Sequence, residues 1–467
     1  MGARHSGQPR RAAYDVLAAV QDREAYANLL LPRLLAERSI TGRDAAFATE
    51  LSYGTLRGQG TYDAVLAACS DRPLDKLDPP VRRVLRLGAH QLLATRVGAH
   101  AAVATSVDLV KSVTGPRASG YVNAVLRRVA TRDLDAWLDI VAPDPMADPD
   151  GHLAVRYSHP RWIVAAYRGA LGDAADTELE AVLAAGNARP RVTLATFPGG
   201  PPPAGVMPED ATAGRWSPYA FTLSSGDPSR FVESGQASVQ DEASQLAALA
   251  LSRAPLAVPR RDGPELWLDM CAGPGGKARL LLGLAGMTPD GRSPRAAVLA
   301  AELHPHRAAL VRDTLSRVPA PPGPWAVMAA DGNRPPWRDA AFDRVLVDAP
   351  CSGLGALRRR PEARWRKSPD DIGALARLQR ALLRSALAAC RPGGVVAYVT
   401  CSPVLAETRD VVTAVVGSSP GTEILDATAV LRDVPDAGSS SPLFAQLWPH
   451  RHGTDAIFIA LLRCSTQ

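Results

Sequence analysis

The sequence predicts two folds in one chain: an all-α bundle, followed by an α/β domain with a doubly wound, mostly parallel sheet. Apolar residues recur at helical spacing over residues 10–135, whereas short apolar runs alternate with helical stretches from about residue 235 onward. Such alternation is typical of a parallel sheet with helices on its faces. A stretch rich in Pro and Asp, residues 142–149, lies between the two patterns and predicts a linker. We therefore expect domains at 1–140 and 233–467, with a linker and a small α+β region over 141–232.

The helical region is divided by turn signals at residues 39–42, 57–60 and 71–73. Asp78-Pro79-Pro80 predicts a helix start, because Pro is tolerated in the first turn. Two apolar stripes predict helix faces that point into a core. Their members are Val81, Val84, Leu85, Gly88 and Leu92, and Tyr121, Val122, Val125, Leu126 and Val129.

The α/β domain is expected to contain strands at 266–268, 297–301, 325–328, 345–347 and 395–399. Helices are expected from Lys277, from Pro305 and over 371–390. In the region before it, short helical segments at 162–167 and 179–185 precede an alternating piece at 191–194.

Composition narrows the class of protein. A length of 467 residues exceeds the usual domain size of roughly 100 to 200 residues, so more than one domain is expected. The six cysteines form no C-x-x-C pair, which argues against a zinc site and a disulfide scaffold, and no metal is expected. No apolar stretch has the length of a membrane helix. We expect a soluble, cytoplasmic protein with free thiols.

The positive charge is concentrated in the first third of the chain. Residues 1–140 contain 19 Lys and Arg against 14 Asp and Glu, a net charge of +5, and the remainder contributes +1. With a pI of about 9.1, this distribution fits a polyanionic partner such as nucleic acid. A solvated basic surface explains it equally well.

A glycine-rich turn follows the first strand of the α/β domain. It does not match a phosphate-binding P-loop, because Cys271 stands at the first Gly position and Ala278 at the Ser/Thr position. A loose dinucleotide fingerprint remains, with Glu302 at the end of the next strand as a candidate for binding a ribose diol. Asp331 follows the third strand and is either an acceptor for an adenine amino group or part of an ordinary Asp-Gly turn.

Two cysteines follow two further strands, at the sheet edge where ligands bind in this architecture: Cys351 and Cys401. A single Cys beside a strand is most often a small buried apolar residue. Two at corresponding strand ends, with Asp348 three residues before one of them, favour covalent chemistry. Methylation at C5 of cytosine needs such a set, because a thiolate added at C6 makes C5 nucleophilic and an acid at N3 stabilises the charge.

In this interpretation Asp348 is the acid at N3 if its surroundings raise its pKa. The second thiol assists proton removal or enzyme release. Lys277, if it lies near, favours the thiolate form of the nucleophile.

These residues resemble a known family, the Sun-type RNA (cytosine-C5)-methyltransferases, which use S-adenosylmethionine. The resemblance is carried by Asp269-x-Cys271-Ala272-x-Pro274-Gly275-Gly276-Lys277, Asp348-Ala349-Pro350-Cys351-Ser352-Gly353, Thr400-Cys401-Ser402 and Val239-Gln240-Asp241-Glu242-Ala243-Ser244-Gln245. It implies a Rossmann-like class I methyltransferase domain. It also implies that Cys401 is the nucleophile and that Cys351 aids product release.

The resemblance assigns the cofactor to one set of residues: Cys271, Ala272, Gly273, Pro274, Gly275, Gly276, Lys277, Glu302, Asp331 and Asp348. The helical region is similar to the NusB-type RNA-binding domain, through motifs at 50–57, 85–93 and 122–127. That combination is the arrangement of the bacterial RsmB-type enzymes, which implies 16S ribosomal RNA as substrate, free or in a partly assembled small subunit. The sequence does not give the oligomeric state, and we favour a monomer. Two positions depart from the family pattern: Gly273, where Ala is more common, and a looser C-terminal motif at 453–458.

A cluster of cations surrounds Trp365: Arg358, Arg359, Arg360, Arg364, Arg366 and Lys367. It is either a clamp for an RNA strand or a basic loop whose Trp packs inward. Because thiolate addition needs access to C6, the target base must be unstacked, as in a single-stranded or opened segment.

Two other functions fit parts of the sequence. A nicotinamide dehydrogenase would use the glycine-rich turn but leaves both motif cysteines unexplained, and tight binding of NAD would favour it. A non-catalytic RNA-binding or antitermination factor is suggested by the helical region alone, and it would bind RNA without methyl transfer.

Overall fold

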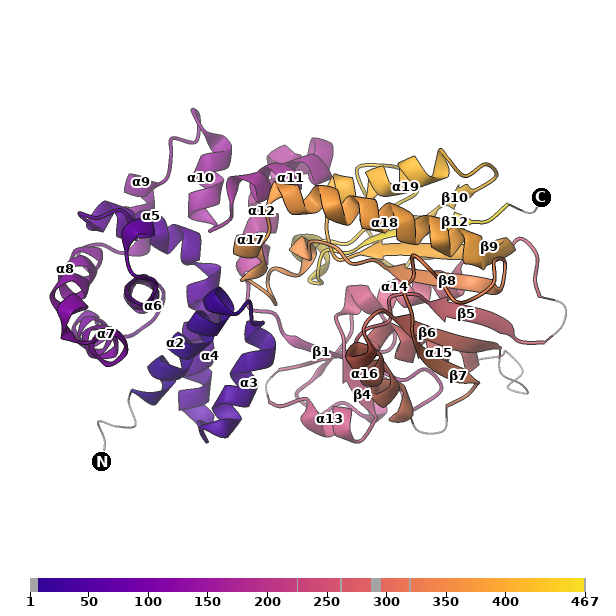
Figure 1. Cartoon of the computed structure of the whole chain (residues 1–467), viewed down its shortest axis with the longest axis horizontal. Helices are drawn as coiled ribbons and strands as arrows, with labels where there is room; N and C mark the ends of the chain where they lie inside the picture. Colours follow the sequence, from indigo (N-terminus) through magenta and orange to yellow (C-terminus); the bar gives the residue numbers. More distant parts are fainter. Residues whose placement is uncertain (1–6, 225, 261–262, 287–294, 319–320, 466–467) are drawn as a thin grey trace. The chain divides into compact units, whose positions relative to one another are not determined.

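The computed structural model describes residues 7–224, 226–260, 263–286, 295–318 and 321–465. The chain forms two compact units. The first consists of Met1–Ala165, Leu179–Ala188 and Leu357–Arg366, and the second of Ala166–Glu178, Arg189–Ala356 and Lys367–Gln467. Figure 1 traces these segments by colour along the sequence.

The first unit is helical throughout its described residues. Its helices are α2 (Gln8–Asp22), α3 (Ala27–Glu37), α4 (Gly42–Arg57), α5 (Gln59–Cys69), α6 (Pro79–Ala94), α7 (Ala99–Thr114), α8 (Ser119–Val129), α9 (Leu134–Val141), α10 (Pro149–Arg156) and α17 (Ala363–Arg366). Both predicted stripes are confirmed, since Val84, Leu85, Val122 and Leu126 are fully buried in one core. The predicted turns separate α3 from α4, α4 from α5, and α5 from α6.

The arginine-rich segment Leu357–Arg366 belongs to this helical unit. Arg364 is fully buried, and its guanidinium donates to Ser158 O and Asn187 Oδ1, both at 2.8 Å. Arg366 donates to Val20 O at 2.9 Å. The clamp interpretation is therefore wrong for Arg364, whose hydrogen bonds hold the unit's own backbone.

Trp365 also packs inward. A Cβ added at Gly60 would lie 2.5 Å from the Trp365 ring, so α5 has a glycine where the indole approaches it. Of the two interpretations of this aromatic residue, the structural one is confirmed.

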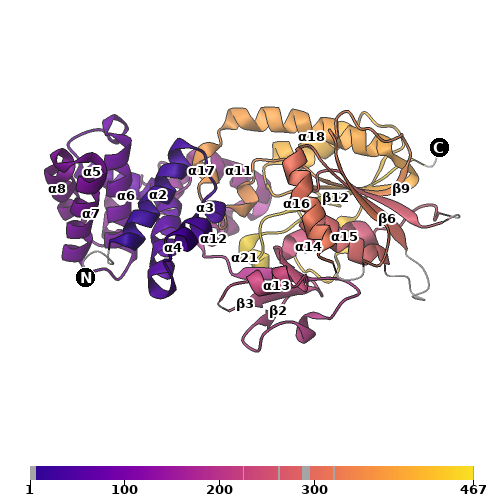
Figure 2. The ribbon, with the colours of Figure 1, turned by 60° about the horizontal axis from the view of Figure 1, so that its bottom comes forward.

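The second unit contains a small antiparallel sheet in the order β2-β3-β1-β4. Its strands are β1 (Val192–Thr196), β2 (Thr212–Ala213), β3 (Ala220–Leu223) and β4 (Ala237–Val239). Figure 2 shows β2 and β3 beside α13 (Ser229–Glu233). Phe221 and Phe231 pack edge to face in its core. The predicted α+β character is confirmed, including the helices α11 (Arg161–Leu171) and α12 (Ala175–Asn187), within which the unit boundaries fall.

The large sheet has the order β10-β12-β9-β8-β5-β6-β7. The five strands from β9 to β7 are parallel: β5 (Glu265–Asp269), β6 (Ala296–Glu302), β7 (Trp325–Ala329), β8 (Phe342–Asp348) and β9 (Cys390–Thr400). The chain runs outward from β5 to β7 and then returns to place β8 on the other side of β5. The predicted doubly wound α/β fold is confirmed.

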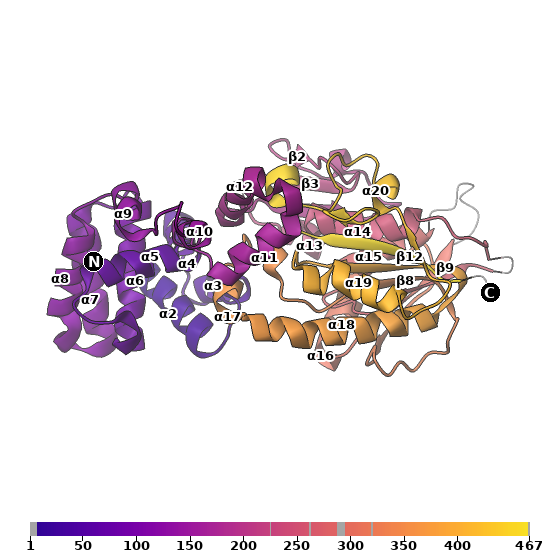
Figure 3. The same ribbon diagram turned by 90° about the horizontal axis from the view of Figure 1, so that it is seen from above.

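Helices cover both faces of this sheet, because alternate strand residues point to opposite sides. Ala397 and Val399 pack in a core with α14 (Glu242–Arg253), α15 (Gly276–Gly286) and α16 (Pro305–Ser316). Val396 and Tyr398 pack in a second core with α18 (Pro369–Ala389) and α19 (Arg409–Val416). Figure 3 views the α18 and α19 side.

Three antiparallel strands complete the sheet at the C-terminal end of the chain: β10 (Glu423–Leu425), β11 (Ala445–Gln446) and β12 (Phe458–Arg463), with the short helices α20 (Ala427–Val430) and α21 (Pro449–His452) among them. Phe458 pairs with Thr400 in the register between β12 and β9. The looser C-terminal motif therefore leads into a paired strand that begins at its last residue, Phe458. In the part of the chain that the structure describes, no helix is both long and apolar enough to cross a membrane.

Replacing Arg364 by Ala is expected to destabilise the protein by about 3 kcal/mol, because several buried carbonyl acceptors lose a charged donor. Thermal unfolding followed by circular dichroism measures this as a lower midpoint.

The exposed Arg360, which lies over the Tyr26 ring, provides the control. Arg360→Ala is expected to cost less than about 1 kcal/mol. Equal midpoints for the two variants would contradict the structural role of Arg364.

Candidate active site

The predicted site residues and Asp269 lie where five parallel strands end. Asp269 ends β5, Glu302 ends β6, Asp331 follows β7, and Asp348 ends β8. Cys401 directly follows β9. In an open parallel sheet these ends share one edge, and the reversal of strand order between β5 and β8 leaves the crevice where ligands bind.

The glycine-rich turn leads from β5 to the first residue of α15, Gly276. Gly275 has φ +115°, and a Cβ there would lie 2.9 Å from Thr314 Cβ. A Cβ on Gly273 would overlap the Glu302 carboxylate. The positive φ favours glycine at 275, and a side chain at 273 would displace the Glu302 carboxylate, so the turn presents bare backbone at a helix N-terminus.

Glu302 is held at this turn. Its Oε2 accepts from Gly273 N at 3.1 Å, its Oε1 accepts from His304 N at 3.2 Å, and Arg307 Nη1 lies 3.3 Å from Oε1. Because Glu302 is only 4% exposed, these contacts fix its carboxylate at the end of β6. The structure thus brings Glu302 and the predicted glycines together.

Asp331 lies after the end of β7, in a turn. A turn was one of the two roles that the sequence predicted for this residue. Its Oδ1 accepts from Asn333 N at 2.9 Å, which is an Asx turn. The neighbouring Gly332 approaches Met270 after β5, since a Cβ there would be 3.1 Å from Met270 Cγ. Asp331 therefore sits at the same sheet edge, with one carboxylate oxygen used by the turn.

Two buried polar side chains beside the turn lack partners. Asp269 is fully buried, and neither carboxylate oxygen accepts a hydrogen bond of normal geometry. Burial, reinforced by the charge of Asp348, raises the pKa of Asp269 to about 7. The Gln240 amide is 7% exposed and also unpartnered, and it faces Gly276, whose added Cβ would be 3.5 Å from Gln240 Cδ. Unpartnered buried groups of this kind are rare and fit a polar ligand.

Neither of these two residues was assigned a role from the sequence. Both stand in the motifs that carry the resemblance, so the signal was present. Burial without a partner, however, is visible only in three dimensions.

Lys277 and Asp348 form a buried ion pair. Lys277 Nζ donates to Asp348 Oδ2 at 2.7 Å and to Ser244 Oγ at 3.2 Å. Burial opposes the charge on Lys277, but the Asp348 carboxylate outweighs it, so the pKa of Lys277 is raised. Lys277 also interacts electrostatically with Cys401, as predicted from the sequence.

The sulfur atoms of Cys351 and Cys401 lie 3.4 Å apart. The pKa of Cys351 is raised well above its usual range by its hydrogen bond to Cys401, by burial, and by the charges of Cys401 and Glu407. The two thiols are therefore unequal: Cys351 retains its proton, and its S–H can stabilise negative charge on Cys401.

Cys271, the third cysteine at this edge, is a different case. Burial and the nearby carboxylates of Asp269 and Asp348 raise its pKa, so it remains a thiol. It can pack against a ligand, but its environment disfavours a nucleophilic role.

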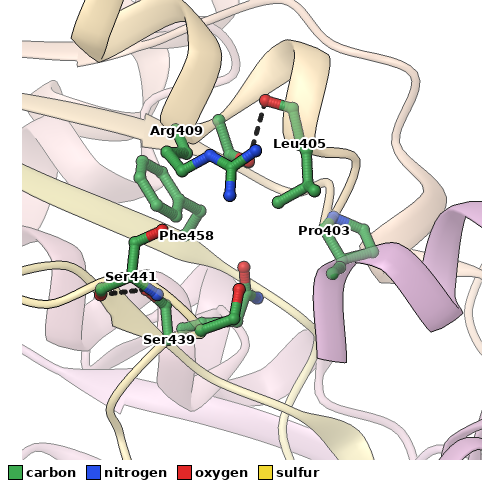
Figure 4. Close-up of a pocket in the computed structure, with 10 residues that line it drawn as sticks. Pro403, Leu405, Arg409, Ser439, Ser441 and Phe458 are labelled. Atoms are coloured by element: carbon green, nitrogen blue, oxygen red, sulfur yellow. Dashed lines mark hydrogen bonds between the residues drawn. The ribbon is translucent and has the colours of Figure 1, made fainter. Parts of the chain in front are cut away.

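A pocket lies beside the segment that follows Cys401 (Figure 4). Pro403, Leu405 and Arg409 contribute to its wall, opposite Ser439 and Ser441. None of the predicted site residues lines this pocket. The described residues contain no cluster of three or more His, Cys, Asp and Glu side chains arranged to hold a metal.

Two family models match the chain. The model described as 16S rRNA methyltransferase RsmB/F matches residues 257–463, and the NusB family model matches residues 7–131. Together they cover most of the α/β domain, including Cys351 and Cys401, and the helical region.

Relatives match over nearly the full length. Rv1407 of Mycobacterium tuberculosis strain H37Rv, a protein named as a methyltransferase, is 51% identical over 97% of this chain and 96% of its own. Ribosomal RNA small subunit methyltransferase B of Pseudomonas syringae pv. tomato is 33% identical over 97% and 96%. The enzyme of the same name from Vibrio cholerae is 31% identical, with the same coverage.

A solved structure shows the same fold. The crystal structure of PH0851 superimposes with a TM-score of 0.76 at 22% identity and covers 97% of each chain. The fold, the site motifs, and relatives at 31% to 51% identity over 97% of the chain agree. The chain belongs to the RsmB/F family of S-adenosylmethionine-dependent rRNA methyltransferases.

Proposed function

We propose that this protein methylates C5 of a cytosine in 16S ribosomal RNA through a transient covalent bond between Cys401 and C6 of the base. The observation that carries the proposal is the 3.4 Å separation of Cys351 and Cys401 beside the Lys277–Asp348 pair. C5 of cytosine is a weak nucleophile, and this set supplies the groups needed to activate it.

The cofactor would be held by the edge formed by β5, β6 and β7. The backbone of Cys271, Ala272, Gly273, Pro274, Gly275 and Gly276 offers close approach, Glu302 can accept from a ribose diol, and Asp331 can accept from an adenine amino group. The unpartnered Asp269 and Gln240 support a polar ligand here. When bound, S-adenosylmethionine supplies an electrophilic methyl group on a sulfonium.

Cys401 is the proposed nucleophile. The Lys277 ammonium and the Cys351 S–H both face it, and each stabilises a thiolate. As the Cys401 sulfur forms its bond to C6, the C5–C6 π electrons shift toward C4, and the C4–N3 π electrons move onto N3. Negative charge therefore develops on N3 and O2.

Asp348 and Lys277 together supply the acid. The ion pair holds one transferable proton, which rests on Lys277. As N3 becomes more basic, a proton can pass from Nζ through Asp348 to N3, which leaves a neutral lysine and an ionised aspartate. The proposed acid at N3 is therefore a coupled pair, and Asp348 is its near member.

Cys351 is the proposed releasing thiol. After C5 has taken the methyl group, the N3 proton returns through Asp348 to the neutral Lys277. Solvent water takes the C5 proton, and the electrons of the C5–H bond re-form the C5–C6 double bond as the C6–S bond breaks. Cys401 then leaves as a thiolate, and the protonated Cys351 donates a hydrogen bond to it. This assignment follows from the raised pKa of Cys351.

The RNA substrate is proposed from the relatives named ribosomal RNA small subunit methyltransferase B. The NusB-matching region, with its excess of positive charge, would bind and orient the RNA. We also propose domain boundaries near residues 140 and 233. We propose a cytoplasmic location, because ribosomal RNA is the proposed substrate. We propose a monomer, because one chain carries every catalytic group.

Cys401→Ala should abolish methyl transfer to unmodified 16S RNA, and Cys351→Ala should form covalent RNA adducts that persist in denaturing gels. The first variant loses the attacking atom, and the second loses the donor that stabilises the departing thiolate. Labelled cofactor and gel electrophoresis measure the two effects.

Cys390→Ala serves as the control, because Cys390 is a buried residue at the opposite end of β9. It should methylate without forming adducts. Methylation by Cys401→Ala, or release by Cys351→Ala without an adduct, would contradict the assigned roles.

Asp269→Asn should stabilise the cofactor-free protein increasingly as the pH rises from 4 to 8. The folded-state pKa of Asp269, about 7, lies above the unfolded value of about 3.9. Folding therefore becomes less favourable for the wild type as pH rises between these values, and the penalty is constant above them. Unfolding midpoints measured across this range test the prediction.

The exposed Asp339 is the comparison residue for the loss of a surface carboxylate. The difference between Asp269→Asn and wild type should change more with pH than the difference between Asp339→Asn and wild type. A pH-independent difference for Asp269→Asn would mean that Asp269 is ionised without penalty.

A further inference from the structure

Glu407 is a fully buried carboxylate outside the set of residues assigned from the sequence. It ends the short 3-10 helix Leu405–Glu407, six residues after Cys401. A carboxylate with no exposure to water requires several hydrogen-bond donors. The origin of those donors identifies what the residue holds in place.

The donors come from the loops that carry the two cysteines. Ser352 directly follows Cys351, and it donates to Glu407 twice: from its N to Oε1 at 2.7 Å and from its Oγ to Oε2 at 2.5 Å. Ser402 directly follows Cys401, and its Oγ donates to Oε2 at 2.6 Å. The two serine hydroxyl oxygens are 3.1 Å apart.

A fourth donor extends this network to the backbone before Cys351. Gln379 on α18 donates through Nε2 to Glu407 Oε1 at 3.1 Å and to Pro350 O at 2.9 Å. Gln379 and Ser402 are fully buried, and Ser352 is 4% exposed. The network therefore binds the residues on both sides of Cys351 and the residue after Cys401.

The β8–β9 pairing alone does not fix the two sulfurs. Its register ends at Asp348 and Val399, before either cysteine. Ala349 N and Gly355 N donate to Val399 O and Cys401 O, but the segment between them, which contains Cys351, needs a further constraint. The Glu407 network supplies that constraint.

We propose that Glu407 is a positioning residue, which sets the distance between the sulfur atoms of Cys351 and Cys401 through Ser352 and Ser402. The inference rests on the proposed function, because the sulfur spacing matters only if both thiols act on one reaction. The Cys401 hydrogen bond and burial are the main causes of the raised pKa of Cys351, and Glu407 adds to them, which agrees with the releasing role.

Glu407→Leu removes every acceptor while keeping a similar volume. We expect kcat to fall about 100-fold with an unchanged KM for RNA, because misplaced reacting groups slow the chemical step without weakening binding. Glu407→Gln should recover most of this loss, since the serine hydroxyls can turn and accept from its amide.

A second readout does not depend on methyl transfer. Phenylarsine oxide bridges two thiols that are held close together, so its affinity reports the sulfur spacing directly. Cys390 and Cys464 form a second close thiol pair, so all variants carry Cys390→Ala. In this background the otherwise unchanged protein should bind the arsenical and Cys351→Ala should not. Glu407→Leu should bind it about tenfold more weakly, the affinity cost of a lost hydrogen-bond constraint of about 1.4 kcal/mol, and Glu407→Gln should bind it nearly as wild type does.

Glu242→Leu is the matched control. Glu242 is a buried carboxylate of the same unit that accepts from the Trp216 and Ser217 backbone, and it makes no contact with the cysteine loops. It should unfold at a lower temperature and retain wild-type arsenical affinity. If Glu407→Leu does not fold, the double variant Ser352→Ala/Ser402→Ala, which keeps the carboxylate, is judged by the same criteria.

Wild-type arsenical affinity and kcat in Glu407→Leu would overturn the proposal, as would a Glu407→Gln variant as impaired as Glu407→Leu. If wild type transfers no methyl group to RNA, the proposed function fails. The arsenical measurement still decides the role of Glu407 in that case.

Discussion

The site depends on the parallel pairing of β8 and β9. This pairing aligns Asp348 with Val399 and brings two cysteines that are 50 residues apart in the sequence to one sheet edge, where the loops that follow the strands hold their sulfur atoms 3.4 Å apart. The strands are held by burial on both faces, since Val347 and Tyr398 pack toward α18 while Leu346 and Val399 pack toward α14. The chemistry of the two thiols therefore follows from a core that contains no catalytic group.

Two buried aspartates in this unit differ in their hydrogen-bond and ion-pair partners. Asp343 is fully buried and paired with Arg260 and Arg391, so it stabilises the fold. Asp269 is equally buried but has no such partner, and its pKa is raised to about 7. The first arrangement is complete in the protein alone, whereas we propose that a bound cofactor completes the second. We interpret the burial of Asp269 without a partner as a feature that lowers the stability of the fold and serves cofactor binding.

Much of this account is accessible from the sequence, because its signals are local. Strand and helix alternation predicts the sheet, and motifs place Gly273, Glu302 and Cys401 at its edge. Three features were not accessible. Arg364 resembles an RNA contact in the sequence, because composition does not reveal that its side chain is buried. The strands β10 and β12 have no sequence pattern that distinguishes them from neighbouring segments. Glu407 gains its proposed role only from contacts with residues such as Ser352, 55 positions away. Long-range packing decides each of these.

The central claim is that Cys401 bonds to the base. RNA that contains 5-fluorocytidine tests it directly, because fluorine at C5 cannot be removed as a proton and the intermediate should persist. Incubation with S-adenosylmethionine followed by proteolysis and mass spectrometry locates the modified peptide. The account predicts a nucleotide attached at Cys401 and carrying the transferred methyl group. Attachment at Cys351, or methylated RNA with no protein adduct, would contradict it.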